Sequence, residues 1–359
     1  MPSLLTNTVI LLVSITATAS AQTVKLPDSL VISGYLETYL AAHTDNDRER
    51  PPFFYSHHRT NEVNLNLAFI RAAFRDQRVR GNLALMAGTY TNQNLASEPG
   101  VLRNIMEASV GVNLSRQGDT WIEMGVFPSH IGMESAIGRD CWNLTRSIAA
   151  DNTPYYEAGI RLLRYSANGK WLLSLLYLNG WQTIQPNSRS GLPGIGHQVQ
   201  YTPSERVLFN SSSYVSRTTR LADQPMRYFH NFYSQFRIRP KLSAALGFDI
   251  GMENERLDGR PRGIWISPLA MVRTHWQGRW QLGGRLEYYS DPGRIIIDIS
   301  PEHPFEVAGW SVNLDYLVGS RLMWRNEVRG LHAPHDFFDV NDQPSSTYLL
   351  WSTAMAFSF

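Results

Sequence analysis

The last fifteen residues, 345–359, alternate between two kinds of side chain. Large apolar side chains recur at every second position, with Thr353 as the one lapse: Leu349, Trp351, Met355, Phe357 and Phe359. This period of two predicts a β-strand with one apolar and one polar face. A final strand that ends on an aromatic residue is typical of outer-membrane β-barrels, where it pairs with the first strand and leaves no open edge. A core strand of a soluble β-sandwich is the alternative.

Similar alternating segments follow one another from residue 31 onward, and the gaps between them switch between short and long. The short gaps lie near residues 76–78, 115–119, 166–169, 202–205, 240, 278 and 317–319. The long gaps are residues 42–61, 91–102, 128–153, 182–194, 218–225, 253–262, 291–304 and 331–343.

Seven short and eight long connections join about sixteen strands, and the weak segments 195–201 and 206–215 leave fourteen or eighteen strands open. We therefore predict an all-β fold, a transmembrane antiparallel up-and-down β-barrel over residues 31–359. Its short turns are expected to face the periplasm and its long loops the outside of the cell.

Several segments indicate which face meets the membrane. From Leu242 to Ile250 the even-numbered residues are all apolar, whereas Ser243 and Asp249 lie on the opposite face. The polar face must point inward, because an Arg or Lys that faces lipid at mid-depth costs about 2 to 4 kcal/mol. The predicted barrel therefore encloses a wet lumen.

The predicted pore-lining residues are acids from the early strands and bases from the later ones: Glu37, Glu107, Glu123, Glu157, Arg237, Arg239, Arg273, Arg285, Arg325 and Arg329. Two arrangements are open. Acids on one wall and bases on the opposite wall would create a transverse field that favours polar solutes. Alternatively, the charges pair across the lumen and fill it. This is favoured by the acids that lie among the later arginines: Asp249, Glu287, Asp315 and Glu327.

The longest connection, residues 128–153, is unusually apolar for an exposed loop. We predict that it enters the barrel mouth and narrows the pore, with Ile131, Met133, Arg139, Asp140, Cys141, Trp142 and Arg146 as its constriction residues. A lid that packs only on neighbouring loops or on a partner is the alternative. Cys141 is the sole cysteine of the chain, and we expect it to be a buried apolar residue rather than a reactive thiol.

The first 21 residues predict a cleaved secretory leader, because an apolar core from Val9 to Ile15 precedes small residues up to Ala21. Residues 22–30 are expected to form a periplasmic segment. Beyond the leader, no run approaches the ~18 consecutive apolar residues that a spanning helix requires. Charged residues make up 18% of the chain, below the ~25% of ordinary soluble proteins, which favours a wall that faces lipid. The formal charge of +2 gives no indication of nucleic-acid binding.

Motifs of enzymes are scarce. His57, His58 and Glu62 lack the helical spacing that places two histidines on one face around a metal. Ser129 and His130 are neighbours in sequence, whereas a nucleophile and its base are normally brought together by the fold. We therefore predict no enzyme, no catalytic residue, no metal and no cofactor.

Several stretches between residues 34 and 182 resemble one family. They include GYLETYL, PPFFYSHHRTNEVNLNLAFIRAAF and, as the most specific, GVFPSHIGMESAIGRDCWNLTRSI. This half of the chain closely resembles the OmpL-like β-barrel porin family of Bacteroidota outer membranes. The resemblance implies an outer-membrane channel for small solutes, and it transfers no cofactor and no catalytic residue to this sequence.

The leading prediction is thus an outer-membrane porin that lets small polar solutes or ions diffuse passively through a water-filled lumen. The alternative is a plugged barrel that serves as a scaffold or docking subunit of a larger outer-membrane assembly. The expected partners are outer-membrane lipid and the barrel-insertion machinery, which would recognise the terminal row of Trp351, Met355, Phe357 and Phe359. A homo-oligomer and a complex with other outer-membrane proteins both remain open.

Overall fold

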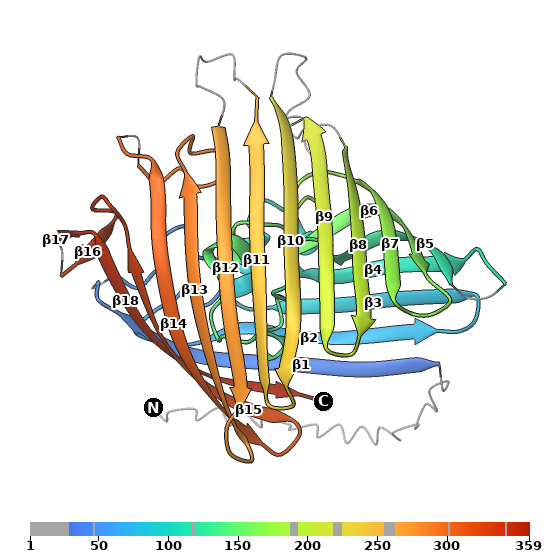
Figure 1. Cartoon of the computed structure of the whole chain (residues 1–359), viewed down its shortest axis with the longest axis horizontal. Helices are drawn as coiled ribbons and strands as arrows, with labels where there is room; N and C mark the ends of the chain where they lie inside the picture. The colour runs from blue at the N-terminus through green and yellow to red at the C-terminus, as the bar shows by residue number, and fades with distance from the viewer. Residues whose placement is uncertain are drawn as a thin grey trace, which may run out of the picture.

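The computed structural model describes residues 29–359 except for 46, 117–118, 187–192, 218–224, 255–262, 301 and 342. The predicted leader, residues 1–21, and nearly all of the predicted periplasmic segment, residues 22–30, lie outside the described residues. Sixteen antiparallel strands close into one barrel (Figure 1). This confirms the predicted fold class and strand number. No helix in the described ranges is both long and apolar enough to cross a membrane.

The barrel strands are β1 (Leu30–His43), β2 (Val63–Arg75), β3 (Val79–Ala87), β4 (Ile105–Asn113), β5 (Thr120–Pro128), β6 (Tyr156–Tyr165), β7 (Trp171–Leu178), β8 (Gly194–Ser204), β9 (Val207–Arg217), β10 (Met226–Arg239), β11 (Leu242–Glu253), β12 (Gly263–His275), β13 (Trp280–Asp291), β14 (Phe305–Val318), β15 (Leu322–His332) and β18 (Thr347–Ser358). The connections hold the short helices α1 (Thr89–Asn94), η1 (Gly100–Asn104), η2 (Gly138–Asp140) and α2 (Ile148–Asp151), and the hairpin β16 (Phe338–Val340) and β17 (Gln343–Ser345).

The seven connections at one end of the barrel have at most six residues, whereas the eight at the other end have at least eight. We call these the short-turn end and the long-loop end. Gly278 and Gly319 provide the positive φ angles, 53° and 67°, that two of the short turns require. The alternation of short and long connections confirms the sequence-based prediction, and the short-turn end is the periplasmic one in such barrels.

The barrel closes where β18 pairs with β1. Tyr35 lies opposite Ser358, and His43 lies opposite Leu350. The backbones of Gly34 and Phe359 exchange two hydrogen bonds of 3.0 and 3.1 Å. The Phe359 ring lies over Gly34 so closely that a Cβ atom there would come within 2.3 Å of the ring. The terminal residue therefore completes the ladder that removes the last open edge.

The two faces of β18 have different surroundings. Leu349, Trp351 and Met355 are exposed on the outer surface, where lipid would contact them. Ala354 and Ala356 are buried on the inner face. Small residues are suited to this inner face because chain segments fill the adjacent part of the lumen. The buried apolar clusters lie between the wall and these segments, so the packed core of the protein is inside its barrel.

Candidate functional site

The longest connection, residues 129–155, folds into the barrel (Figure 1). We call it the infolded loop. It leaves β5 at Pro128, descends to η2, turns, rises through α2 and enters β6 at Tyr156. Its backbone contacts side chains of β10, β13, β14 and β15. The loop is thus a hairpin that occupies the lumen rather than a lid on the surface.

The descending half of the loop spans the depth of the barrel. Near the long-loop end, His130 Nδ1 lies 2.8 Å from Oε2 of Glu157 on β6. At the bottom, the Arg139 guanidinium donates to the carbonyl oxygens of Ser320 and Arg321. Together with Gly319, these two residues form the short turn between β14 and β15. The loop therefore reaches from the long-loop end to the short turns.

Arg325 of β15 holds the base of the loop. It donates hydrogen bonds to the carbonyl oxygens of Gly138, Cys141 and Trp142. Its Nε and Nη2 atoms also donate to the carboxylate of Asp315, at 2.8 and 3.1 Å. A guanidinium presents five donors in a planar fork, so one side chain bonds both a carboxylate and three carbonyls. Arg325 is fully buried as a result.

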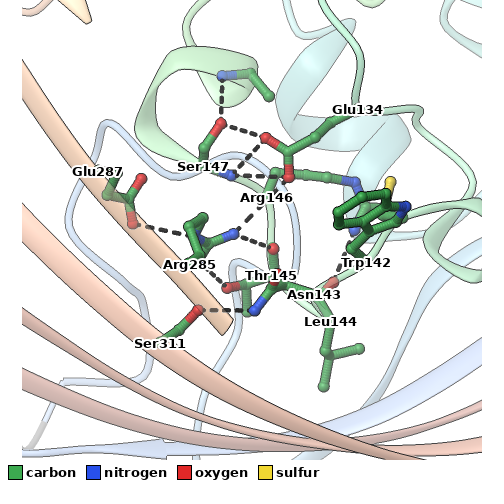
Figure 2. Close-up of polar contacts among 12 residues, drawn as sticks. Glu134, Trp142, Asn143, Leu144, Thr145, Arg146, Ser147, Arg285, Glu287 and Ser311 are labelled. Atoms are coloured by element: carbon green, nitrogen blue, oxygen red, sulfur yellow. Dashed lines mark hydrogen bonds and ion pairs between the residues drawn. The ribbon is translucent and has the colours of Figure 1, made fainter. Parts of the chain in front are cut away.

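A second anchor holds Thr145 in the ascending half (Figure 2). Arg285 Nη1 donates to the Thr145 carbonyl oxygen at 2.7 Å, and the Thr145 amide donates to Glu327 Oε2 at 2.5 Å. Arg285 also donates to Glu327 Oε1, at 3.1 Å. The backbone of one loop residue thus bridges the two members of a buried ion pair.

A third anchor lies at the start of α2. The amide of Ile148 donates to Glu287 Oε2 at 2.7 Å, and Arg329 donates to Oε1 of the same carboxylate at 2.7 Å. Arg329 Nη1 also donates to the carbonyl oxygen of Arg146 at 2.9 Å. A carboxylate at the first turn of a helix satisfies an amide that has no partner within the helix.

The two halves of the loop are also joined to each other. Arg146 donates to the carbonyl oxygens of Ser135 at 2.6 Å, Ala136 at 3.1 Å and Leu144 at 2.7 Å. The Cys141 thiol is buried and donates to the Ser135 carbonyl oxygen at 3.3 Å. Burial raises the pKa of this thiol, so it stays protonated at neutral pH. The loop is therefore a bonded unit, not a flexible flap.

The remaining predicted constriction residues occupy different surroundings. Ile131 and Met133 line a hollow beside the loop, whereas Asp140 is exposed. Trp142 lies near the short-turn end, with its ring 5.0 Å from the Arg273 guanidinium carbon. Arg139, Cys141 and Arg146 hold the loop together or to the wall, as described above. Whether any of them limits the passage of solute stays a prediction.

The four predicted acids of the early strands all have basic or imidazole partners nearby. Glu107 pairs with Arg71, Glu123 with Arg80 and Arg161, Glu37 with His57, and Glu157 with His130. Apart from the two histidines, which come from loops, the partners are on β2, β3 and β6 of the same wall. The charges therefore pair locally, neither across the lumen nor as one acidic wall facing one basic wall.

The six predicted arginines of the later strands lie in three different surroundings. Arg285, Arg325 and Arg329 anchor the infolded loop. Arg237 and Arg273 instead line a hollow of about 270 Å³ with Trp142 near the short-turn end, which we call the basal hollow. Arg239 is exposed at the end of β10, beyond a register irregularity. Whether these side chains line a conducting path also stays a prediction.

Two further hollows flank the infolded loop. The side hollow, of about 210 Å³, lies between the loop and β2 to β4, and Arg71, Met86 and Met106 contribute to its lining. A smaller hollow of about 20 Å³ separates the loop from Asp249 and other residues of β10 to β12. A space of that size holds about one water molecule. The loop therefore lies closer to the wall of β10 to β12 than to that of β2 to β4.

Sequence analysis did not reveal that the first connection, residues 44–62, also folds inward. Phe53, Phe54 and His57 are almost completely buried, and His57 Nε2 lies 2.9 Å from Glu37 Oε1. The Asn152 side chain of α2 donates to the Phe53 carbonyl oxygen at 3.0 Å. This connection thus covers the infolded loop from the long-loop end. The paired phenylalanines in PPFFYSHH were the available indication of burial.

No group of metal-ligating side chains occurs among the described residues. His57 and His58, weighed above as a metal cluster, have different partners. His57 bonds Glu37, and His58 Nδ1 lies 2.9 Å from the Phe54 carbonyl oxygen. Both histidines therefore have structural contacts, His57 with β1 and His58 within the first connection.

Solved porin structures share this architecture at low sequence identity. An anion-selective porin from Comamonas acidovorans is 10% identical, with a TM-score of 0.61 over 92% of this chain and 99% of that chain. OmpT of Vibrio cholerae, solved in a trimer form, is 8% identical, with a TM-score of 0.58 over 92% and 99%. OprB of Pseudomonas putida is 9% identical, with a TM-score of 0.60 over 92% and 94%. At these identities the similarity establishes the fold alone.

No curated protein sequence matches the chain. A family model described as "Putative beta-barrel porin-2, OmpL-like" matches residues 29–359. This match includes the second half of the chain, where the sequence offered only its strand rhythm and its terminal phenylalanine. The chain therefore belongs to the OmpL-like family of outer-membrane β-barrel porins.

Proposed function

We propose that the protein is a diffusion porin in which small polar solutes pass around the infolded loop. The observation that carries this proposal is the space left beside the loop. Its three arginine anchors come from β13 and β15, whereas the side hollow and the basal hollow lie beside it. The loop narrows the lumen, as the constriction loops of porins do, and its neighbouring walls carry polar side chains that hold water.

The distribution of charge favours anions. The three anchor arginines are matched by three carboxylates, because Arg285 pairs with Glu327, Arg325 with Asp315 and Arg329 with Glu287. Two groups of wall residues contain more bases than carboxylates. Arg206, Arg237 and Arg273 line the basal hollow with one carboxylate, Glu205. Arg71, Arg80 and Arg161 share the two carboxylates of Glu107 and Glu123. A positive potential in a narrow wet passage raises the local concentration of anions.

Planar-bilayer recording of the purified barrel tests both statements. A stepwise conductance is expected, and in a salt gradient the reversal potential should have the sign of anion preference. The double variant Arg237→Gln/Arg273→Gln should move this potential towards cation preference, because it removes two positive charges from the basal hollow. The matched control is Arg164→Gln, which removes an exposed arginine on the outer side of β6 and should leave the potential unchanged.

The recordings test conduction and anion preference independently of each other. An inserted barrel without any conductance step would exclude the porin. A conducting barrel with cation preference, or with the same reversal potential in the double variant and the wild type, would exclude the role of the arginines and leave the porin in place.

One observation favours the plugged scaffold as a second candidate. Aromatic side chains from two long connections and from the start of β14 pack into a buried cluster at the long-loop end; they include Phe53, Phe54, Phe305 and Phe338. Such packing would close part of the mouth. Purification without crosslinker separates the candidates, because stoichiometric recovery of other outer-membrane proteins with a non-conducting barrel would favour the scaffold.

The terminal aromatic row predicts a defect in membrane insertion. Phe359→Ser should lower the amount of folded protein in the outer membrane several-fold and leave synthesis unchanged, because the serine loses the ring that packs over Gly34. Resistance to unfolding by detergent without heating measures the folded fraction. Phe359→Tyr keeps the ring and should insert normally. If Phe359→Ser and the wild type insert equally well, the ring of Phe359 is not part of the signal that directs insertion.

A further inference from the structure

The outer surface of the barrel is apolar on most strands, but on three neighbouring strands it also carries a group of polar side chains. Leu173 and Leu175 on β7, and Leu246 and Ile250 on β11, are exposed on this surface. Between these strands, the outward positions of β8, β9 and β10 include five polar residues. They are His197, Ser211, Ser213, His230 and Ser234, and we call them the outer polar patch.

The outward direction of the patch follows from its neighbours in each strand. Phe209 on β9 and Phe232 on β10 have 44% and 51% of their surface exposed, and the patch residues share their alternation. The intervening residues Asn210, Ser212 and Asn231 are buried on the inner face. Figure 1 shows β8, β9 and β10 side by side in one wall of the barrel. Polar side chains therefore occur on both faces of these strands.

The patch residues are in contact with one another. Ser213 lies opposite His197 in the β8–β9 register and opposite His230 in the β9–β10 register. Ser213 Oγ is 2.5 Å from His197 Nδ1, and Ser211 Oγ is 3.1 Å from His230 Nε2. Among the described residues, His197 Nε2 and His230 Nδ1 have no hydrogen-bond partner. Each ring thus keeps one polar nitrogen directed away from its serine.

The patch lies within the membrane rather than at its border. Ser213 is six residues from Val207, the first residue of β9 at the short-turn end. Six residues span about 20 Å along a strand, or about 15 Å of depth at the ~40° tilt of such barrels. The apolar band of an outer-membrane barrel is about 25 Å tall. A ring nitrogen without a partner at this depth would cost free energy against lipid.

Beside the patch, the surface is hollowed. Ser211 and Ser234 form part of a hollow of about 420 Å³ on the outer face, between the larger side chains of Trp171, Tyr201 and Phe248. Small polar side chains that lie between large aromatic ones pack poorly against disordered lipid chains. Inside a membrane, two protein surfaces associate through small residues, which let the backbones approach closely, and through hydrogen bonds between polar side chains.

We infer that a second copy of this chain packs against the outer polar patch and forms a two-fold symmetric dimer. Serine and neutral histidine each offer both a donor and an acceptor, so the patch can bond its own copy without a counter-charge. A two-fold contact needs only one such patch on each subunit. Inside the membrane, the partner that can supply these groups is another barrel wall.

A closed trimer would need a second contact surface on each barrel, at an acute angle to the outer polar patch. Away from the strand ends, a further polar pair on the outer face is Asn326 and Thr353, which lie opposite each other on β15 and β18. Thr353 Oγ1 already accepts from Trp324 Nε1 and donates to the Arg325 carbonyl oxygen. Moreover, β9 is eight strands from β1 in either direction, so β18 lies almost opposite the patch. Contacts between opposite sides would build a row rather than a ring.

Cysteine crosslinking in native outer membranes tests the dimer without reference to conductance. The background is Cys141→Ala, which removes the buried thiol and keeps a small apolar side chain. In it, Ser213→Cys should give a disulfide-linked band of twice the chain mass under mild oxidation. Ala270→Cys, on the outer face of β12, is the matched control and should stay monomeric.

A second measurement does not depend on disulfide geometry. In mild detergent, native mass spectrometry should find two chains for the wild type and for Ala270→Trp, and one folded chain for Ser213→Trp, because the indole fills the contact. The inference is overturned if the wild type is a single chain and Ser213→Cys fails to crosslink. A trimer, or crosslinking of Ser213→Cys to a different protein, would overturn it as well. A monomer that carries tightly bound lipid would assign the patch to lipid instead.

Discussion

Deletion of residues 132–148 should raise the single-channel conductance several-fold. The infolded loop runs from His130 near the long-loop end to Arg139 at the short turns, so it occupies the lumen over the depth of the barrel. Its removal leaves only the polar walls, and the conductance of a wet pore rises with its open cross-section. Recording of single channels in planar bilayers measures the change directly.

The deletion is expected to leave the barrel intact. Each of the three anchor arginines keeps its carboxylate on the wall when the loop is gone, Arg285 with Glu327, Arg325 with Asp315 and Arg329 with Glu287. A second variant replaces residues 132–148 by a Gly/Ser segment of the same length. It retains the connection without its anchors, and should give a noisy conductance between those of the wild type and the deletion. Wild-type conductance in both variants, with folded barrels, would show that the loop does not limit the pore.

The barrel architecture could be predicted from the sequence because each strand has a recognisable local pattern of side chains. Alternation is visible wherever one face meets lipid, as in residues 242–250, and glycines such as Gly278 and Gly319 mark short turns. The rhythm of connections depends on these local features alone, and the structure reproduces it. The least certain segments, 195–201 and 206–215, became β8 and β9. Their alternation is weak because polar side chains occur on both faces, as with Asn210 inside and Ser211 outside.

The arrangement of charge was only partly accessible. The sequence left open whether the acids of the early strands form one wall or pair across the lumen, and neither arrangement took account of Arg71, Arg80 and Arg161 on the same strands. The strand register places Glu123 directly opposite Arg161, so local pairing follows once the β5–β6 register is known. Opposite charges on adjacent strands attract more strongly than charges across a wet lumen, because the distance is shorter and less water lies between them.

The depth of the infolded loop could not be derived from the sequence. The apolar residues of the loop indicated burial, but its anchors are mostly bonds between wall side chains and loop backbone. Arg325, for example, bonds the carbonyl oxygens of Gly138, Cys141 and Trp142. Every residue carries a carbonyl oxygen, so such bonds leave no pattern of residue types. The sequence therefore indicates the arginines of the wall but not the loop carbonyl oxygens that they bond.

Arg325→Met should lower the free energy of unfolding by about 3 to 5 kcal/mol, the usual effect of breaking a buried ion pair. The methionine fills most of the space but leaves the Asp315 carboxylate without its guanidinium, and Asp315 is buried with 2% of its surface exposed. It also frees the three carbonyl oxygens at the base of the infolded loop. Denaturant-induced unfolding in detergent measures the loss of stability, and protease cleavage near Gly138 should become faster because the base of the loop is released.

The double variant Arg325→Met/Asp315→Asn separates the two effects of this arginine. It removes the unpaired charge, so the free energy of unfolding should recover towards the wild-type value. The carbonyl oxygens of Gly138, Cys141 and Trp142 still lack their donor, so cleavage of the loop should remain fast. Arg164→Met, which changes an exposed arginine, is the matched control for both measurements. Wild-type protease resistance of the double variant would mean that Arg325 stabilises only the wall, and that the loop is held by its other anchors alone.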